Sequence, residues 1–210
     1  MKFAILIYDG VEPIDVGATL GVLSMARRFQ TDIEMISVAE RKGEILLASN
    51  IRTIADYAYD DCPDYDVLIV TGGPGWVEQC KNEYTINFLK NANKNTTIVS
   101  ACTGAMILAA AGLTDGLEIT TRRFSAPGET TPLNMITDYA PTARPVTATL
   151  VDSGSIITGG GVTLAIDVMF YLLEKFYGEE ISQKTAKLME YDRALAANSQ
   201  HLGIINSNTS

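Results

Sequence analysis

The chain has 210 residues and a net charge of −9, which fits one acidic α/β domain with a substantial core. The negative charge argues against a nucleic-acid-binding surface and a basic membrane-binding patch, and no apolar run reaches the roughly 18 residues of a membrane span. Its three cysteines show no CxxC spacing, so they offer neither a disulfide framework nor a structural zinc site and fit a reducing cytoplasm.

Strands and helices are predicted to alternate through the first half of the chain. Residues 2–8 (KFAILIY) form a continuous apolar run, as in a parallel strand covered on both faces. Asp9 and Gly10 then favour a turn, and Pro13 suits the first turn of a helix. The predicted helices are 13–29 and 83–93, and the predicted strands are 2–8, 32–39, a hairpin of 44–47 with 51–54, and 66–71.

The same alternation is predicted for the second half. A strand ending before Cys102, a strand at 118–121, and a strand pair at 144–150 and 155–158 are expected. The predicted helices are 104–113, one within 123–139, 162–177 ending at Gly178, and 179–195. We therefore expect a single domain over residues 1–195, followed by a loose polar tail over 196–210.

Alternating strands and helices predict an α/β fold, a three-layer helix/sheet/helix sandwich around a mainly parallel sheet. Ligands in such folds bind outside the carboxyl ends of the strands. Three features are expected at that edge: the turn after Tyr8, the glycine-rich loop 72–75, and Cys102. A functional site is therefore expected where these strand ends meet.

The stretch 98–113 (IVSACTGAMILAAAGL) predicts a buried strand, an abrupt turn that carries Cys102, and a helix that starts directly behind it. Free backbone N–H groups and the helix dipole at such a start favour a thiolate and lower the pKa of the cysteine. Cys102 is therefore a candidate nucleophile. The alternative is an ordinary small side chain packed between a core strand and a core helix.

Residues on neighbouring strand ends supply the groups that a cysteine nucleophile needs. The N–H groups of Thr103, Gly72 and Gly73 are candidates for an oxyanion hole, at about 3–4 kcal/mol per donor. Asp15, or alternatively Glu12, can bring a carboxyl group to the sulfur and act as a general acid. Two plainer roles remain open: a helix-dipole carboxylate for Asp15, and a tight turn for the glycines.

Several motifs make the chain resemble the ThiJ/PfpI superfamily of class I glutamine amidotransferase-like proteins: ILIYDGVEPIDVGA, DVLIVTGGPG, SACTGAMILAAAGL and ITGGGVTLAIDVMFYLLEKFYG. The ACTGA elbow, Asp15 and the segment KLMEYD make it most similar to the isonitrile hydratase-like branch. The resemblance implies a flavodoxin-like sheet with a nucleophile elbow, and a homodimer.

By resemblance, Cys102 matches the family's nucleophile, Asp15 its acidic partner, and Thr103 the threonine after the nucleophile. Peptidase-like members have a histidine directly after the cysteine, and other branches have one after the paired threonines. This chain has Thr103 and Arg122 at those places. Its one histidine, His201, is expected on the surface of the tail. A Cys–His pair of the protease, amidase or glyoxalase type is therefore not expected.

The resemblance implies an enzyme that hydrates an isonitrile to an N-substituted formamide through a Cys102 thioimidate, with Asp15 donating a proton and no metal or organic cofactor. The substrate is expected to be a small molecule, selected by pocket walls in loops 56–64 and 122–131. One alternative is a thiol-based sensor or stress protein, because an accessible cysteine of low pKa oxidises readily. The domain also resembles the sensor half of AraC-like regulators. Another alternative is a protease- or amidase-type family member without a working Cys–His pair.

Further residues have open or structural roles. Arg122 and Arg123 either bind an anionic substrate or are solvated and paired with acidic residues, and the second role is favoured for at least one of them. Asp167 lies in an apolar helix, where a buried carboxyl group needs a partner, and is expected to be structural. Cys62 and Cys80 lack a helix-start context and are expected to be ordinary thiols.

Overall fold

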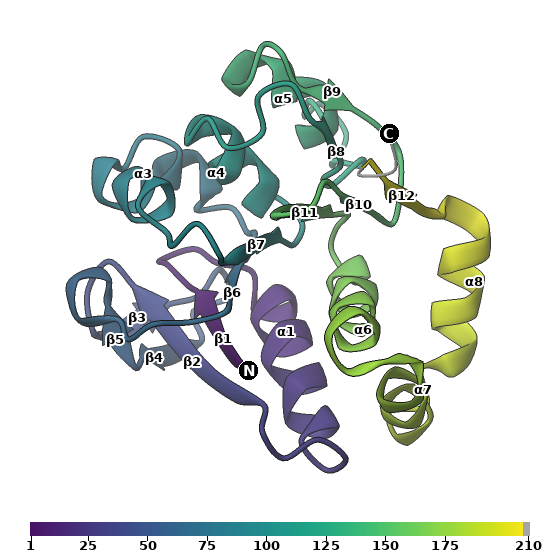
Figure 1. Cartoon of the computed structure of the whole chain (residues 1–210). Helices are drawn as coiled ribbons and strands as arrows, with labels where there is room; N and C mark the ends of the chain where they lie inside the picture. Colours follow the sequence, from purple (N-terminus) through teal and green to yellow (C-terminus); the bar gives the residue numbers. More distant parts are fainter. Residues whose placement is uncertain (208–210) are drawn as a thin grey trace.

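A computed structural model describes residues 1–207 and shows a central sheet between two layers of helices (Figure 1). The strands of this sheet are β1 (Lys2–Leu6), β2 (Glu34–Ala39), β5 (Tyr57–Ala58), β6 (Val67–Val70), β7 (Thr97–Ser100), β10 (Leu150–Asp152), β11 (Ile156–Gly159) and β12 (Ile204–Asn206). Their order is β12–β10–β11–β7–β6–β1–β2–β5, and all neighbours are parallel except β10 with β11. The predicted three-layer, mainly parallel sandwich is confirmed.

Helices cover both faces of the sheet (Figure 1). One layer holds α1 (Pro13–Ala26), α6 (Leu164–Tyr177), α7 (Glu179–Leu188) and α8 (Asp192–Leu202), in which α7 contacts each of the other three. The other layer holds α2 (Trp76–Gln79), α3 (Glu83–Lys90), α4 (Gly104–Ala110) and α5 (Pro132–Tyr139), in which α4 contacts each of the other three. Within residues 1–207, no helix has the length and apolar character needed to cross a membrane.

The apolar runs of β1 and β6 lie at the centre of the sheet. Phe3, Ile5 and Ile69 are fully buried there. Successive side chains of a strand point to opposite faces, so a strand with helices on both sides needs apolar residues throughout. The three parallel strands β1, β6 and β7 lie side by side in this sheet. Their carboxyl ends therefore meet at one edge of the sheet.

Smaller elements flank the sheet. β3 (Gly43–Leu46) and β4 (Arg52–Ala55) form the predicted antiparallel hairpin, η1 (Tyr59–Asp61) is a short 3-10 helix, and β8 (Glu118–Ile119) pairs with β9 (Arg144–Pro145). The prediction of one strand over 144–150 was wrong, because its start pairs with β8 and its last residue begins β10. Pro145 has no N–H to donate to a ladder, which favours the break.

The C-terminal segment differs most from the prediction. The single helix predicted over 179–195 is two helices, α7 and α8, separated where Glu190 takes a left-handed backbone with φ 54°. The prediction that the tail is loose was also wrong. The tail continues α8 to Leu202 and then forms β12, which pairs in parallel with β10. Residues 208–210 of that tail lie outside the described residues.

Asp167 is one reason why this segment is ordered. The Asn198 side-chain amide donates to both carboxylate oxygens of Asp167 at 3.1 Å, and the Tyr191 hydroxyl donates to Oδ2 at 2.8 Å. The structural role expected for Asp167 is confirmed by these partners. They tie α8 to α6, and because they lie far apart in sequence, the polar composition of the tail did not reveal them.

The start of α4 lies so close to β6 that only glycine fits at residue 104. A Cβ added to Gly104 would lie 2.0 Å from the Val70 carbonyl oxygen. We expect Gly104→Ala to lower the free energy of unfolding by about 1–3 kcal/mol or more, because the clash is with backbone. Gly21→Ala in α1 is the control, since nothing lies within 4 Å of its added Cβ.

Alanine at residue 21 should instead stabilise the chain by about 0.5–1 kcal/mol, because alanine is the better helix former. Urea unfolding of both variants and the wild type measures the two effects. A Gly104→Ala variant as stable as the wild type would contradict the close contact between α4 and β6.

Candidate active site

Three strand ends bring the predicted site residues together. Asp15 lies in the helix after β1, and Cys102 lies in the turn after β7. The loop after β6 connects them. The N–H of Gly72 donates to Oδ2 of Asp15 at 2.7 Å, and the N–H of Gly73 donates to Oγ1 of Thr103 at 2.9 Å. The residues singled out in the sequence therefore form one cluster at the carboxyl edge of the sheet.

Cys102 occupies a sharp turn between β7 and α4. Its backbone is left-handed, with φ 52°, which is uncommon for a residue with a side chain and typical of a nucleophile on a strand-to-helix turn. The Cys102 N–H donates to the Gly160 carbonyl oxygen at 3.1 Å, and the Thr121 hydroxyl donates to the Cys102 carbonyl oxygen at 2.6 Å. Two other segments of the chain therefore hold this turn in place.

Gly161 closes one side of the sulfur. A Cβ added to Gly161 would lie 2.6 Å from the Cys102 Sγ and 2.9 Å from its Cβ. The backbone at residue 161 therefore contacts the cysteine directly, and only glycine leaves room for it. Cys102 is 3% exposed, so a ligand reaches the sulfur only from the cavity that Cys102 lines.

Asp15 is a fully buried carboxyl group with one oxygen in use. Oδ2 accepts the bond from Gly72, whereas Oδ1 has no partner among residues 1–207. Burial raises the pKa of Asp15 to about 7, against the lowering effects of the Gly72 N–H and the Arg122 charge and with a contribution from Glu12. At neutral pH both the acid and the carboxylate are present, as a proton carrier requires.

The thiol of Cys102 does not have the low pKa predicted from its place before a helix. Burial raises its pKa to about 12, and the Asp15 carboxylate adds to the rise. Hydrogen bonds from Thr103 and the charge of Arg122 act in the opposite direction without outweighing burial. The prediction was wrong because the motif shows the helix start, whereas the loss of water around the sulfur depends on packing from distant segments.

Cys102 and Asp15 influence each other through charge. Neither Asp15 oxygen is hydrogen-bonded to the sulfur, since Oδ2 accepts from Gly72 and Oδ1 lacks a partner in the described chain. An ionised Asp15 raises the pKa of the Cys102 thiol, so protonation of Asp15 makes the thiol easier to ionise. Between the two pKa values the pair holds one proton, and this proton lies on the sulfur.

The predicted oxyanion donors have internal partners. Gly72 and Gly73 direct their N–H groups at Asp15 and Thr103, so neither is free for a ligand in this structure. A Cβ added to Gly72 would lie 2.5 Å from the Thr103 nitrogen and 2.9 Å from the Asp15 Oδ2. The absence of a side chain at Gly72 therefore lets the loop fit between these residues. Among the predicted donors, the Thr103 N–H is the one that lowers the pKa of the Cys102 thiol.

A cavity of about 350 Å³ opens over Cys102 and Thr103, a size that holds small-molecule ligands. Its wall combines apolar and charged side chains, among them Trp76, Met135, Val162, Glu12, Arg122 and Glu129. The expectation that loop 122–131 helps to form the wall is confirmed. The same expectation for loop 56–64 was wrong, because Tyr59, Cys62 and Asp64 line a different cavity.

Sequence reasoning missed the part of the wall formed by Trp76, Met135 and Val162. The position of Trp76 directly after the glycine-rich loop was one available signal. Met135 belongs to a segment with no recognisable motif, and Val162 lies in a motif that the sequence analysis used only for the family resemblance. Their contribution follows from the packing of α5 and α6 near the elbow, which the sequence pattern does not specify.

The adjacent arginines separate in the structure. Arg122 lines the cavity, and its carbonyl oxygen accepts a hydrogen bond from the Leu133 N–H at 3.2 Å. The Arg123 guanidinium lies over the ring of Phe124, 4.5 Å from the ring centroid, and Phe124 is 69% exposed. Arg122 therefore belongs to the site, and Arg123 belongs to the surface.

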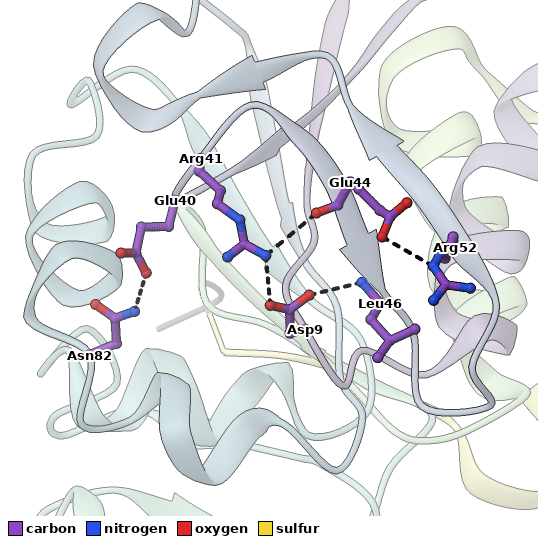
Figure 2. A network of polar contacts seen from close by, with 7 residues as sticks. All are labelled: Asp9, Glu40, Arg41, Glu44, Leu46, Arg52 and Asn82. Carbon is purple, nitrogen blue, oxygen red and sulfur yellow. Dashed lines mark hydrogen bonds and ion pairs between the residues drawn. The ribbon is translucent and has the colours of Figure 1, made fainter.

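A network of polar contacts anchors the turn between β1 and α1, the turn that carries Glu12 (Figure 2). Asp9 Oδ1 accepts a hydrogen bond from the Leu46 N–H at 2.8 Å, and Asp9 Oδ2 pairs with Arg41 at 3.0 Å. The Gly10 N–H donates to the Leu46 carbonyl oxygen at 2.8 Å. The hairpin β3–β4 thus supports the chain segment that leads into Asp15.

The other thiols and the histidine lie outside this cavity. Burial raises the pKa of Cys62 to about 11 and that of Cys80 to about 12, which fits the ordinary thiols expected from the sequence. His201 is exposed on α8. A Cys–His pair therefore has no geometric basis in the described residues.

Comparisons with known proteins agree with the geometry. A sequence model of the DJ-1/PfpI family matches residues 1–175. The chain is 27% identical over 194 residues to isonitrile hydratase of Pseudomonas putida. This match covers 91% of this chain and 78% of that enzyme. It is 23% identical over 150 residues to the HTH-type transcriptional regulator GbdR of Pseudomonas aeruginosa, which covers 71% of this chain but 39% of the regulator.

A solved structure shows the same fold. The crystal structure of a ThiJ/PfpI family protein from Pseudomonas syringae has a TM-score of 0.78 to this chain, with 23% sequence identity, and the match covers 91% of this chain and 75% of that one. At this level of identity the likeness concerns the fold alone. It confirms the flavodoxin-like α/β arrangement predicted from the sequence.

Proposed function

Because the chain belongs to the DJ-1/PfpI family, we propose that it is a cysteine-dependent enzyme that hydrates an isonitrile-like small molecule to an N-substituted formamide. The similarity to isonitrile hydratase along 91% of the chain supports this reaction. The observation that carries the proposal is the buried Asp15, whose pKa near 7 and unpartnered Oδ1 suit a proton carrier beside a buried cysteine.

In the first step, the Cys102 sulfur forms a bond to the terminal carbon of R–N≡C. The thiol proton passes to the Asp15 carboxylate and from there to the same carbon. The product is the thioimidate Cys–S–CH=N–R, and Asp15 is again a carboxylate. Asp15 is fully buried and does not line the cavity, so the proposed proton path requires Oδ1 to come within hydrogen-bond reach of the substrate on binding, as catalytic hydrogen bonds often do.

In the second step, water adds to the thioimidate carbon. Asp15 takes a proton from the attacking water and passes it to the imine nitrogen, which gives the tetrahedral intermediate Cys–S–CH(OH)–NH–R. The carbon–sulfur bond then breaks, the hydroxyl proton passes through Asp15 to the sulfur, and R–NH–CHO leaves. Thr103 lowers the pKa of the Cys102 thiol and so stabilises the charge on the leaving thiolate. Neither step requires a metal or an organic cofactor.

Purified protein incubated with a panel of alkyl and aryl isonitriles tests the proposal. We expect the N-substituted formamide to accumulate over many turnovers, measured by proton NMR or chromatography. A panel in which no isonitrile yields formamide above the rate without protein would reject the proposed activity.

A thiol-based sensor is the second candidate, because the chain is also similar to the regulator GbdR. The buried thiol favours it less, since oxidation proceeds through the thiolate and the raised pKa of Cys102 disfavours that form. Dilute peroxide followed by intact-mass spectrometry separates the two candidates. A reversible oxygen adduct on Cys102, without isonitrile turnover, would support the sensor.

Glu12 should set the pH dependence of the reaction through Asp15. The proposed first step needs an ionised Asp15 carboxylate and a protonated Cys102 thiol. The value of kcat/KM should therefore rise as the pH passes through about 7, where Asp15 loses its proton. Glu12 raises the pKa of Asp15, so Glu12→Gln lowers that pKa and should move the rising limb to lower pH.

Glu129→Gln is the matched control for this prediction, because Glu129 also lines the cavity but does not act on the pKa of Asp15. Values of kcat/KM measured from about pH 5 to about pH 9, at intervals of about half a pH unit, would resolve the shift. A limb that moves to higher pH in Glu12→Gln, or moves equally in both variants, would contradict the proposed role of Asp15.

We also propose that the protein works as a cytoplasmic homodimer, without nucleic-acid or membrane partners. The family resemblance supports the dimer, and the net charge of −9 argues against anionic partners. The three free cysteines fit a reducing compartment. Light scattering should give a mass about twice the 22.7 kDa of one chain, and the monomer mass at micromolar concentration would refute the dimer.

A further inference from the structure

Arg122 is a cation that lines the cavity without a close ion pair to the described residues. Among residues 1–207, no carboxylate oxygen lies within 4 Å of its guanidinium nitrogens, although Glu12 and Glu129 line the same cavity. Its Nε is buried without a hydrogen-bond partner. A buried N–H group normally has an acceptor, so the Nε–H of Arg122 is available to an oxygen atom of a ligand.

The position of Arg122 relative to the nucleophile is well defined. The Leu133 N–H holds its carbonyl oxygen at 3.2 Å. A Cβ added to Gly161 would lie 3.1 Å from the Arg122 Cβ and 2.6 Å from the Cys102 Sγ, so both residues flank the same glycine. Both also line the same cavity. A small molecule can therefore reach the sulfur and the guanidinium at the same time.

We propose that Arg122 binds a carboxylate group of the substrate, which makes the substrate a small carboxylate-bearing isonitrile. The planar guanidinium offers paired N–H donors that match the two oxygens of a carboxylate. The buried Nε–H of Arg122 has no acceptor among the described residues, so a ligand carboxylate can supply one. The identity of the reacting group rests on the proposed function, whereas the anion site does not.

The charges of the cavity favour a singly charged group over a phosphate. Glu12 and Glu129 line the same space as Arg122, and two nearby negative charges repel a dianion more strongly than a carboxylate. Arg123 lies over Phe124 and does not line the cavity, so no second arginine is present to balance a dianion. One guanidinium therefore matches one carboxylate.

A plainer role for Arg122 is a general effect of its charge on the sulfur. A positive charge that only favours the thiolate would speed the reaction of Cys102 with neutral and anionic reagents alike. A binding site for carboxylate would favour the anionic reagent in particular. Iodoacetate and iodoacetamide are a matched pair for this test, because they transfer similar groups to sulfur and differ in one negative charge.

The experiment measures the rate of Cys102 alkylation by each reagent, using intact-mass spectrometry, in the wild type and in Arg122→Gln, Arg122→Lys and Arg123→Gln. We expect the ratio of the iodoacetate rate to the iodoacetamide rate to fall about tenfold or more in Arg122→Gln, as for loss of a charge-assisted hydrogen bond. Arg122→Lys should keep part of the ratio, and Arg123→Gln should keep all of it.

Two results would overturn the anion site: an unchanged ratio in Arg122→Gln, or an equal fall in Arg123→Gln. Alkylation does not depend on isonitrile turnover, so failure of the proposed reaction would leave this result readable. Turnover of isocyanoacetate against its methyl ester then tests the substrate class. The wild type should prefer the carboxylate, Arg122→Gln should lose the preference, and a wild type that prefers the ester would refute the proposed substrate.

Discussion

Replacing Cys102 by alanine should abolish formamide formation from isonitriles. The proposed reaction passes through a covalent bond between the Cys102 sulfur and the isonitrile carbon, and alanine has no atom that can form it. No other described cysteine lines the cavity, so no neighbouring thiol can take over. Initial rates measured by NMR should equal those of the reaction without protein.

The matched control for this variant is Cys62→Ala. Cys62 is a half-buried free thiol that lines a different cavity, so its loss should leave the rate unchanged. Circular dichroism and thermal unfolding of both variants check that the fold persists. Binding in the cavity alone is expected to give at most about a few per cent of the wild-type rate. Higher residual turnover in Cys102→Ala would contradict covalent catalysis.

Asp15→Asn should lower kcat/KM by about 10²–10⁴-fold, the usual contribution of a positioned proton carrier. The amide keeps the size of the side chain and can still accept the hydrogen bond from the Gly72 N–H. It cannot take the thiol proton or deliver it to carbon. The rising limb of the pH profile near pH 7 should also disappear, because the group that titrates there is gone.

The same variant should make the thiol more acidic. The ionised Asp15 raises the pKa of Cys102, so a neutral amide lowers that pKa and moves the pH dependence of alkylation by iodoacetamide to lower pH. This combination of a more reactive sulfur and a slower enzyme separates proton transfer from damage to the fold. Wild-type turnover in Asp15→Asn, or alkylation shifted to higher pH, would refute the assigned role.

The sheet was predictable because its signals are local. The apolar runs of β1 and β6 and the glycines that follow them indicate buried parallel strands and turns without reference to the rest of the chain. The C-terminal segment was not predictable in this way. Its order depends on Asn198 and Tyr191 bonding to Asp167, and on β12 pairing with β10, and these partners are brought together only by the fold.

The candidate site divides along the same line. Cys102, Asp15 and the glycine loop follow strand ends, so the topology of a parallel sheet was enough to predict that they meet. The protonation of the sulfur was mispredicted, because burial by distant segments outweighs the local helix start. The role of Arg122 stayed open from sequence, since nothing in the pair of arginines shows that one faces a cavity and the other lies over Phe124.

The contact between Gly161 and the Cys102 sulfur has a consequence for which electrophiles can react. Backbone lies against one side of the sulfur and the cysteine is 3% exposed, so a reagent approaches the attacking lone pair from the cavity. We therefore expect the sulfur to react faster with a rod-shaped head group, such as a terminal isonitrile carbon, than with a branched or ring-bearing electrophilic centre. Steric selection at residue 161 would thus distinguish slim linear substrates from bulky ones before any chemistry begins.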